Sequence, residues 1–391
     1  MLADESADLL AVLTHAGVSR LTVRRALAPL LRCGLGVGEA LEALEVSEGA
    51  PAVRALGRAL RHRMTSTGVE IAATVAAELT ALRQRRISIL TLGQPGYPPL
   101  LAEIPDPPLA LFVRGKPGPL ADRAVAIVGS RRCAPTSAML ATDIAETIAR
   151  YGRVVVSGLA SGVDGAAHRG AVQAGRSTVA VLGHGHGHCY PARHRGLARR
   201  ILETDGALIS EYPPSWPPRR HFFPERNRII SGLTEAVLVV EASQRSGSLI
   251  TARLALEQGR DVLAVPGSIS TGNHAGCHRL LKDGAALVEG IEDVYAALAI
   301  DTSIGESIHG TAGTTDGTVR STTEEPIGDD AGLSELEIRL LDLIGGDGRS
   351  TEVLVELLGE PASRTLGLLT ELELKGFVRA IGDGYIRRPA R

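Results

Sequence analysis

Short, almost uninterrupted apolar runs recur through the middle of this 391-residue sequence. They are Val125–Val128, Val154–Val156, Thr178–Leu182, Ala207–Ile209, Ala236–Val240 and Asp261–Val265. Longer segments with helix-like spacing of apolar residues separate them. Uninterrupted apolar strands joined by such crossovers are typical of a parallel sheet covered by helices on both faces. The pattern predicts an α/β domain of the extended Rossmann-like, doubly wound type.

The two ends of the sequence follow other patterns. The first part is rich in Ala, Leu and Arg, with apolar residues three and four apart, which predicts helices. Residues 297–332 hold seven acidic residues against one arginine among Gly, Thr and Ser, which is typical of a flexible linker. Three short helical patterns and a hairpin with a Gly-Asp-Gly turn then predict a winged-helix-like domain. The expected domains are 1–85 (helical, SAM- or HhH-like), 86–296 (Rossmann-like), 297–332 (linker) and 333–391 (winged-helix-like).

Composition places the protein among globular chains that bury a large core. Apolar residues make up 44% of the sequence and charged residues 22%. The beginning of the chain is acidic where a signal peptide would be basic, and apolar runs stay well below the roughly 18 residues of a membrane span. Four cysteines lie far apart, which argues against a disulfide framework or a zinc ribbon. We expect a cytoplasmic protein with reduced cysteines.

The net charge of −2 hides an uneven distribution. Between residues 193 and 228 there are eight arginines against four acidic residues. A local positive face can bind a polyanion even where the whole chain is slightly acidic. The charge pattern therefore leaves nucleic acid open as a ligand.

The segment 221–232, with the sequence HFFPERNRIISG, carries the clearest candidate chemistry. It sets two phenylalanines beside Arg226 and Arg228. Bases stack on aromatic rings, and guanidinium groups pair with phosphates in a planar fork. The segment favours single-stranded nucleic acid as the ligand. The alternative is a loop whose phenylalanines belong to the core and whose arginines are solvated.

Three turns that follow predicted strands offer backbone N–H groups to an anion. They are Gly129-Ser130-Arg131, Ser157-Gly158 and the Arg245–Ser248 turn, each placed just before a helix. Plain strand-to-helix turns are the alternative. Neither a GxGxxG fingerprint nor the lysine of a Walker A loop is present, so we expect no nucleotide cofactor. Asp164 and His168 have the spacing of a general-base pair, although a helix cap and a structural histidine are the commoner reading.

The loop Gly183–Cys189 alternates glycine with His184, His186 and His188. Histidine and cysteine are zinc ligands, but a single glycine-rich loop without a second ligand pair is a poor zinc site. We predict no metal, and interpret the loop as a rim of the phosphate site.

Several of these runs together resemble the DprA family of DNA-processing proteins, also called Smf. The resemblance is close over residues of about 90 to 290 and looser in the two terminal domains. It rests on GSR (129–131), SGLASGVDGAAH (157–168), AVLGHGHGHCYP (180–191), SEYPP (210–214), FPERNRIISGL (223–233), VVEASQRSGSLITARLALEQGR (239–260) and AVPGS (264–268).

The resemblance implies a protein that binds and protects single-stranded DNA without catalysis and helps load the RecA recombinase during natural transformation and recombination. It also implies a homodimer, and single-strand-binding protein is a further candidate partner. Family contacts carry over to Arg131, Arg193, Phe223, Arg226 and Arg228. From the anion-receptive turns and their surroundings we add Gly129, Ser130, Ser157, Gly158, Asn227, Ser246 and Gly247.

A Rossmann-like enzyme that binds or processes nucleotides is the alternative function. It would use Glu241 and the turn after it on a phosphorylated nucleoside. The ligand of the winged-helix-like domain is also open, because Ser363–Leu369 is apolar for a recognition helix, so protein and duplex DNA are both candidates.

Overall fold

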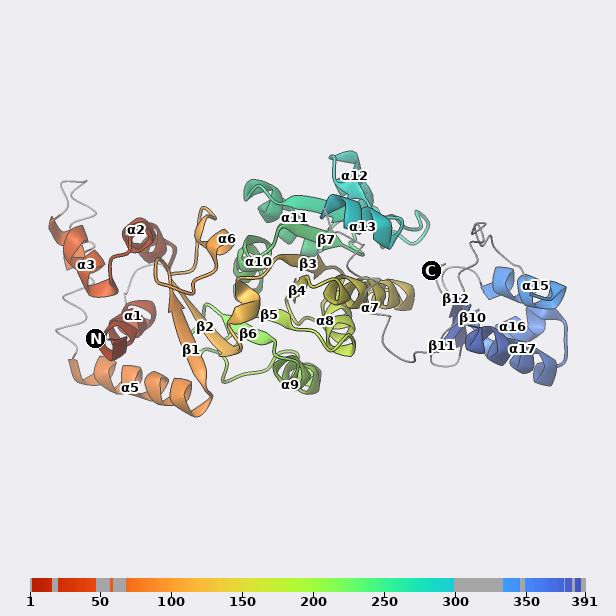
Figure 1. Cartoon of the computed structure of the whole chain (residues 1–391), viewed down its shortest axis with the longest axis horizontal. Coiled ribbons are helices and arrows are strands. Elements are labelled where there is room, and N and C mark those ends of the chain that lie inside the picture. The colour runs from red at the N-terminus through yellow and green to blue at the C-terminus, as the bar shows by residue number, and fades with distance from the viewer. Residues whose placement is uncertain are drawn as a thin grey trace, which may run out of the picture. The chain divides into compact units, whose positions relative to one another are not determined.

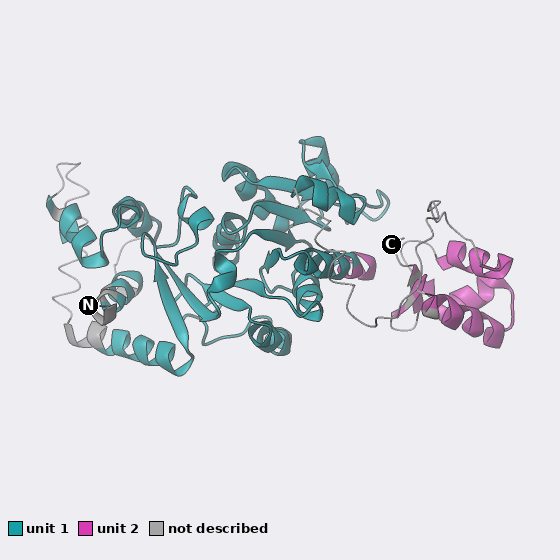
Figure 2. Ribbon diagram, in the orientation of Figure 1, with its two compact units in different colours: residues 1–133, 140–305 teal, residues 134–139, 306–391 magenta. Residues whose placement is uncertain are grey.

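A computed structural model gives the fold of the chain (Figure 1). It describes residues 2–15, 20–46, 57–58, 68–298, 333–344, 349–375, 377–381 and 384–387. Residues 299–332 of the predicted acidic linker lie outside the described residues. The chain forms two compact units, Met1–Cys133 with Leu140–Gly305 and Ala134–Met139 with Glu306–Arg391 (Figure 2). The finer domain boundaries predicted from the sequence stay predictions.

A mostly parallel sheet forms the centre of the first unit. Its described strands are β1 (Ile87–Thr91), β2 (Ala110–Gly115), β3 (Ala124–Val128), β4 (Val154–Ser157), β5 (Thr178–Leu182), β6 (Ala207–Ser210), β7 (Ala236–Val239), β8 (Asp261–Ala264) and β9 (Ala286–Leu287). They lie in the order β1-β2-β6-β5-β4-β3-β7-β8-β9. The six predicted strands are confirmed, and they pair in parallel. The sequence did not predict β1 and β2, which add an antiparallel edge next to β6.

Helices cover both faces of this sheet, which confirms the doubly wound class. They are α6 (Pro99–Ala102), α7 (Pro135–Arg150), α8 (Val163–Gln173), α9 (Arg195–Glu203), α10 (Phe222–Gly232), α11 (Ser248–Glu257), α12 (Ala275–Lys282) and α13 (Ile291–Ala297). Strand β5 shows the reason for its uninterrupted apolar run. Val179 and Val181 belong to the core that contains Ile229 of α10. Ala180 and Leu182 belong to a second core with Ile201 of α9.

The amino-terminal part of the first unit is helical, as predicted. Its helices are α1 (Leu2–His15), α2 (Arg20–Arg32), α3 (Val37–Val46) and α5 (Gly68–Gln84). Leu27 and Leu31 of α2 share the main core with Phe112 of β2. The turn at Gly93 lies against α2 so closely that a Cβ there would overlap the carbonyl of Leu31. The helices thus pack on the antiparallel edge of the sheet.

The described part of Glu306–Arg391 confirms the winged-helix-like prediction. It contains α15 (Glu335–Ile344), β10 (Arg349–Ser350), α16 (Thr351–Leu358), α17 (Ala362–Leu374), β11 (Val378–Ile381) and β12 (Gly384–Arg387). Leu341, Leu354 and Leu369 meet in its core. The short strand β10, which pairs with β12, was not predicted. Residues 382 and 383 of the predicted turn lie outside the described residues.

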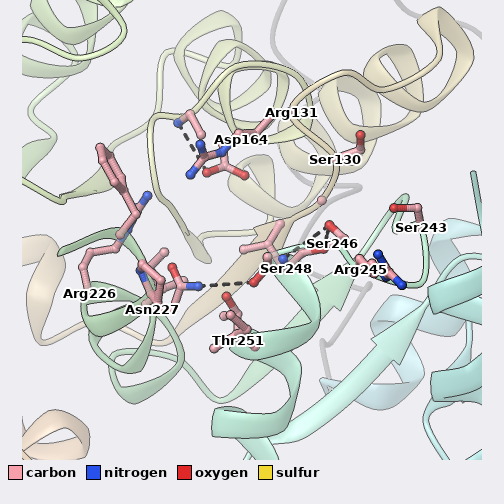
Figure 3. Close-up of a pocket in the computed structure, with 18 of the residues that line it drawn as sticks. Ser130, Arg131, Asp164, Arg226, Asn227, Ser243, Arg245, Ser246, Ser248 and Thr251 are labelled. Carbon is pink, nitrogen blue, oxygen red and sulfur yellow. Dashed lines mark hydrogen bonds between the residues drawn. The ribbon is translucent and has the colours of Figure 1, made fainter. Parts of the chain in front are cut away.

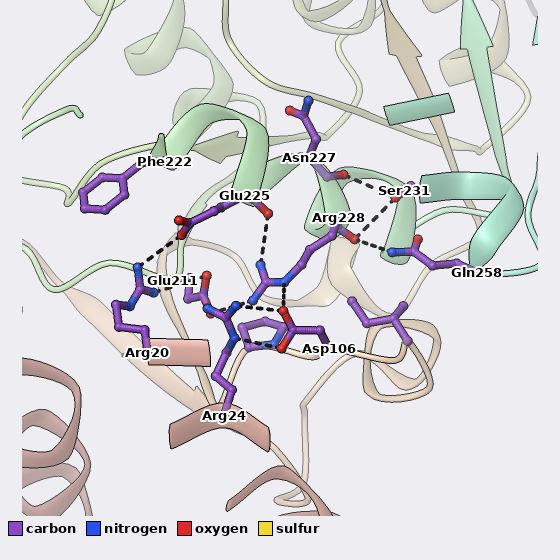
Figure 4. Close-up of polar contacts among 12 residues, drawn as sticks. Arg20, Arg24, Asp106, Glu211, Phe222, Glu225, Asn227, Arg228, Ser231 and Gln258 are labelled. Carbon is purple, nitrogen blue, oxygen red and sulfur yellow. Dashed lines mark hydrogen bonds and ion pairs between the residues drawn. The ribbon is translucent and has the colours of Figure 1, made fainter. Parts of the chain in front are cut away.

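Buried ion pairs connect α2 to the end of β6 and to α10 (Figure 4). We call Arg20, Arg24, Asp106, Glu211 and Arg228 the Glu211 cluster. Glu211 is 2% exposed, and its Oε1 lies 2.6 Å from Nη2 of Arg228 and 3.2 Å from Nη1 of Arg24. Asp106 accepts hydrogen bonds from Arg24 at 2.7 and 2.9 Å and from Arg228 at 3.2 Å.

The charges of the cluster compensate one another. Burial alone would raise the pKa of Glu211, but Arg228, Arg24 and Arg20 together lower it from 4.5 to about 2. The carboxylate is therefore ionised at neutral pH. Removing it would leave guanidinium groups buried without a counter-charge, which is costly.

We predict that Glu211→Gln lowers the free energy of unfolding at pH 7 by about 3 to 5 kcal/mol. A carboxylate with a depressed pKa stabilises the fold above its unfolded pKa, and the contribution disappears as pH falls from about 4.5 towards 2. The gap between wild type and variant, measured by urea unfolding across a pH series, should narrow in that window. Glu225→Gln is the control, because that side chain is 39% exposed and should change stability by about 1 kcal/mol or less. A gap that is independent of pH, or equal losses in both variants, would contradict the prediction.

Candidate nucleic-acid interface

The strand order reverses between β3 and β7, and a pocket opens at the carboxyl ends of these strands. The chain runs from β3 towards β4, β5 and β6 on one side, and from β7 towards β8 on the other. Open α/β sheets bind ligands in the crevice at such a switch point. The pocket has a volume of about 390 Å³, and we call it the switch-point pocket (Figure 3). It is lined by residues from the loops after β3, β4 and β7 and from the first turns of α10 and α11.

Backbone hydrogen bonds tie these loops together. The N–H of Ser130 donates to the carbonyl of Glu241 at 2.8 Å, and the N–H of Val163 donates to the carbonyl of Ser130 at 3.2 Å. Gly129 allows this close approach. A Cβ on Gly129 would lie 2.6 Å from Cγ2 of Val163 and 2.9 Å from the carbonyl oxygen of Glu241. The rim of the pocket is thus rigid before any ligand enters.

Exposed arginines surround the opening of the pocket. Arg131, Arg132 and Arg245 line it with exposed side chains. Among the described residues, none of the three has a salt bridge. Positive charge that has no protein partner is available to an anionic ligand.

A buried Asp164–Arg226 pair lies behind this rim. Nη1 of Arg226 donates to the carbonyl of Val181 at 2.6 Å, and burial lowers the Arg226 pKa to about 10, so the group stays charged at neutral pH. Burial raises the pKa of Asp164, and Arg226 partly opposes that shift. The carboxylate of Asp164 accepts the N–H groups of Gly158 at 3.2 Å and Ala160 at 3.3 Å. The Asp164 carboxylate therefore holds the loop after β4 through these two hydrogen bonds.

The start of α11 presents the hydroxyl groups of Ser246 and Ser248 to the same pocket. The hydroxyls of Ser246 and Ser248 lie 2.8 Å apart, and the Asn227 side chain donates to the carbonyl of Gly247 at 3.3 Å. Gly247 precedes the helix without a side-chain cap. The first N–H groups of a helix and its dipole favour a negatively charged group at this end.

Phe222 and Phe223 have different environments although they are neighbours. Phe222 is 2% exposed, and its ring stacks on Tyr212 with centroids 4.0 Å apart. Phe223 lines the pocket, with the Arg131 guanidinium 5.3 Å from its ring centroid and the Tyr190 ring at 5.4 Å. Tyr190 is 49% exposed. The core interpretation of this aromatic pair thus fits Phe222, whereas Phe223 stands at a surface with a cation and a second ring.

The pocket brings together eight of the twelve residues predicted to contact DNA: Gly129, Ser130, Arg131, Phe223, Arg226, Asn227, Ser246 and Gly247. The other four lie elsewhere. Ser157 is buried and donates to the carbonyl of Ile127 at 2.6 Å, and the N–H of Gly158 is bonded to Asp164. Arg228 is buried in the Glu211 cluster, and Arg193 is exposed outside the pocket. This arrangement gives no support to a phosphate contact for Ser157, Gly158 or Arg228.

Sequence reasoning missed Arg132, Arg245, Ser248 and Thr251 as lining residues. Arg245 and Ser248 stand in the turn that the sequence had marked as anion-receptive, so the same signal could have identified them. Thr251 gave no signal, because it lies one turn into α11 and reaches the pocket only through the packing of that helix.

The histidines singled out in the sequence, at positions 168, 184, 186 and 188, form hydrogen bonds with different groups. His186 donates through Nε2 to the carbonyl of Phe112 at 2.7 Å, and His188 donates to that of Ser215 at 2.9 Å. His184 lies 2.9 Å from the carbonyl of Gly185 through Nδ1. His168 is fully buried, and burial lowers its pKa to about 3. Within the described ranges, no three His, Cys, Asp or Glu side chains are grouped to hold a metal ion.

Comparisons with known proteins agree with this geometry. The family model for DNA recombination-mediator protein A matches residues 88–299, and the model for the DprA winged helix domain matches residues 324–384. Protein Smf of Escherichia coli is 39% identical over 314 residues, which cover 80% of this chain and 81% of that protein. DNA processing protein DprA of Bacillus subtilis is 40% identical over 221 residues, which cover 56% and 74%.

Two solved structures are similar as well. The X-ray structure of DNA processing protein A from Streptococcus pneumoniae has a TM-score of 0.62 and 33% identity, covering 74% of this chain and 97% of that one. A Helicobacter pylori DNA processing protein A has a TM-score of 0.50 and 28% identity, covering 55% and 97%. That Helicobacter pylori protein has a unique single-stranded DNA binding mode. In the described part of this chain, helices are too short or too polar to span a membrane.

We predict that Gly129→Ala destabilises the protein by about 1 to 3 kcal/mol, because its methyl group would overlap Val163 and the Glu241 backbone. Gly247→Ala is the matched control. It lies at the same pocket, and a Cβ there would have nothing within 4 Å. Urea unfolding of both variants measures the difference. Equal stability of the two variants would show that the loop after β3 yields to the added methyl group.

Proposed function

This chain belongs to the DNA recombination-mediator protein A family, and on that premise we propose that its switch-point pocket binds single-stranded DNA without catalysing a reaction. The observation that carries the proposal is the combination of Arg131 and Arg245, both without salt bridges, with the ring of Phe223 at one pocket. The single-stranded DNA binding named for the Helicobacter pylori relative supports it.

Each part of the pocket has a role in this proposal. Arg131 and Arg245 pair with backbone phosphates, and a hydroxyl group of the Ser246–Ser248 pair at the start of α11 donates to a phosphate oxygen. A base stacks on Phe223, whose ring is already flanked by a cation. None of these groups reads the edge of a base, so binding should show little sequence preference.

We extend the proposal to the cellular role that the family implies. The protein acts in the cytoplasm as a homodimer, protects single-stranded DNA, and helps load RecA onto it during natural transformation and recombination. RecA and single-strand-binding protein are its proposed partners. The family description, a recombination mediator, supports this extension.

A nucleotide-processing enzyme is the second candidate, because a pocket at a switch point is also where enzymes of this fold class hold nucleotides. Such chemistry needs a general base within reach of the substrate. Asp164 is the carboxylate that lines the pocket in the described part of the chain, and its Oδ2 already accepts two backbone N–H groups. This geometry favours binding over hydrolysis.

A gel-shift comparison of single-stranded DNA, duplex DNA and mononucleotides, run beside a nucleotide-hydrolysis assay, separates the two candidates. We expect retardation of a long single strand, weaker retardation of duplex, and no turnover. Hydrolysis at about 1 per second or faster, without retardation of an oligonucleotide, would establish the enzyme instead.

Arg131→Ala should weaken single-strand binding and flatten the slope of log K against log salt by about 0.7, the value of one lost phosphate contact. Stability should be nearly unchanged because the side chain is exposed. Arg228→Ala is the matched comparison. It removes a guanidinium from the Glu211 cluster, so it should lower the free energy of unfolding by about 3 to 5 kcal/mol. An Arg131 variant with wild-type affinity and salt slope would remove the phosphate role.

Phe223→Ala should cost about 1 to 3 kcal/mol of binding through lost stacking, with the salt slope nearly unchanged. Phe222→Ala should instead cost about 3 to 5 kcal/mol of stability, because that ring is buried against Tyr212. Fluorescence anisotropy and urea unfolding measure the two effects. A Phe223 variant that loses stability as Phe222→Ala does, while binding normally when folded, would place both rings in the core.

A further inference from the structure

A second pocket, with a volume of about 380 Å³, lies beside α9, and we call it the α9 pocket. Its charged lining residues are Arg114 of β2 and Arg195 and Arg199 of α9. His184, His186, His188 and Cys189 of the histidine-rich loop complete the polar part of the lining, and neither Asp nor Glu takes part. The cavity is therefore lined by charges of one sign.

The three arginines have no acidic partner in the described part of the chain. Near the end of α9, Asp205 pairs with Lys116 at 2.8 Å, and Glu203 forms no salt bridge with Arg199 among the described residues. Arg195 and Arg199 are four residues apart on one helix, so their side chains leave from the same face. Like charges at this spacing repel one another. An anion in the cavity would relieve that repulsion, so the lining indicates an anionic ligand.

An aromatic bridge joins the α9 pocket to the switch-point pocket. The ring of Tyr190 lies 5.4 Å from that of Phe223, which lines the switch-point pocket. The Tyr190 N–H donates to Nε2 of His184, which lines the α9 pocket. The loop after β4 touches both sites, because Ala160 lines the first and Leu159 the second. Tyr190 therefore stands between two positively charged cavities with a half-exposed ring.

We propose that the α9 pocket is a second phosphate-binding site for the same single strand, and that Tyr190 stacks a base between the two sites. This inference rests on the proposed function and extends it, because it gives the path of the strand across the surface. The strand leaves the switch-point pocket over Phe223 and Tyr190 and places a later phosphate between Arg114, Arg195 and Arg199. Alternating rings and guanidinium groups are the arrangement that binds single strands without sequence preference.

The chemistry that the pocket recognises is a phosphate oxyanion, and two sources could supply it. One is the phosphodiester backbone of the strand, and the other is free inorganic phosphate. The ring of Tyr190 favours the strand as the source, because a base can stack on it and inorganic phosphate cannot. The two sources differ in how binding depends on the length of an oligonucleotide.

The test is the double variant Arg195→Ala/Arg199→Ala in the full-length protein. Affinity for oligothymidylates of increasing length is measured by fluorescence anisotropy over a range of salt concentrations. We expect wild-type affinity for oligonucleotides that fill only the switch-point pocket, and a loss that appears once the strand is long enough to cross Tyr190. For long strands the salt slope should flatten by about 1.4, or about 0.7 for each lost contact.

Two control variants separate charge at the pocket from charge on the helix. Arg200→Ala removes an exposed arginine of the same helix that does not line the pocket, and it should leave length dependence and salt slope unchanged. Arg195→Lys/Arg199→Lys keeps the charge and should retain most of the slope.

Tyr190→Ala tests the stacking step, and it should weaken binding of long strands without changing the slope. Unfolding midpoints near that of wild type would exclude misfolding, since all these side chains are exposed.

The inference and the proposed function fail on different outcomes. If wild type binds no oligonucleotide, the proposed function is wrong and the inference falls with it. If wild type binds but the double alanine variant matches Arg200→Ala at every length, the inference alone is wrong. If in addition calorimetry detects inorganic phosphate binding to wild type and not to the double variant, the α9 pocket holds a free anion and the strand does not reach it.

Discussion

The reversal of strand order between β3 and β7 is the constraint on which the candidate site depends. Neighbouring parallel strands whose crossovers leave in opposite directions cannot fill the space above their carboxyl ends, so a crevice forms there. The N–H of Ser130 donates to the Glu241 carbonyl and joins the loops after β3 and β7 beside this crevice. Gly129 permits the close approach of the two loops. Three loops and two helix starts then face one cavity, although their residues span more than a hundred positions in the sequence.

Helix α10 shows how one short segment serves both the core and the surface. Successive residues of an α-helix are about 100° apart, so residues four positions apart share a face and their immediate neighbours turn away from it. Asn227 and Phe223 therefore reach the pocket, while Phe222 and Arg228 turn towards the amino-terminal helices. The Glu211 cluster fixes the buried side of the helix. That anchoring sets the position of the side chains that face the ligand.

The sequence predicted much of this fold because its signals are local. Strands buried on both faces give uninterrupted apolar runs, and the winged-helix-like region has clear helical periods and turns. Strand β1 escaped notice because its residues are only partly buried and it lies at an antiparallel edge beside turn-forming prolines. Local sequence patterns also could not show which arginines are paired with acidic residues in the fold. Arg226 and Arg228 look equivalent in the sequence, but one partner of Arg228 is Asp106, 122 residues away, and only the tertiary fold brings them together.

Two populations of arginine follow from these packing differences, and they have opposite energetics. In the Glu211 cluster each guanidinium compensates a buried carboxylate. Moving such a guanidinium to a ligand would leave that carboxylate buried without its partner. At the pocket rims, Arg131, Arg245 and Arg195 lose little solvation when they meet a phosphate, and they give up no protein partner. Mutual repulsion among them slightly destabilises the free protein, and a polyanion removes that repulsion on binding. The Glu211 cluster is therefore paired in the interior while the arginines of the two pockets stay without salt bridges at the surface, and in the proposed function this distribution lets a protein of nearly neutral net charge bind a polyanion.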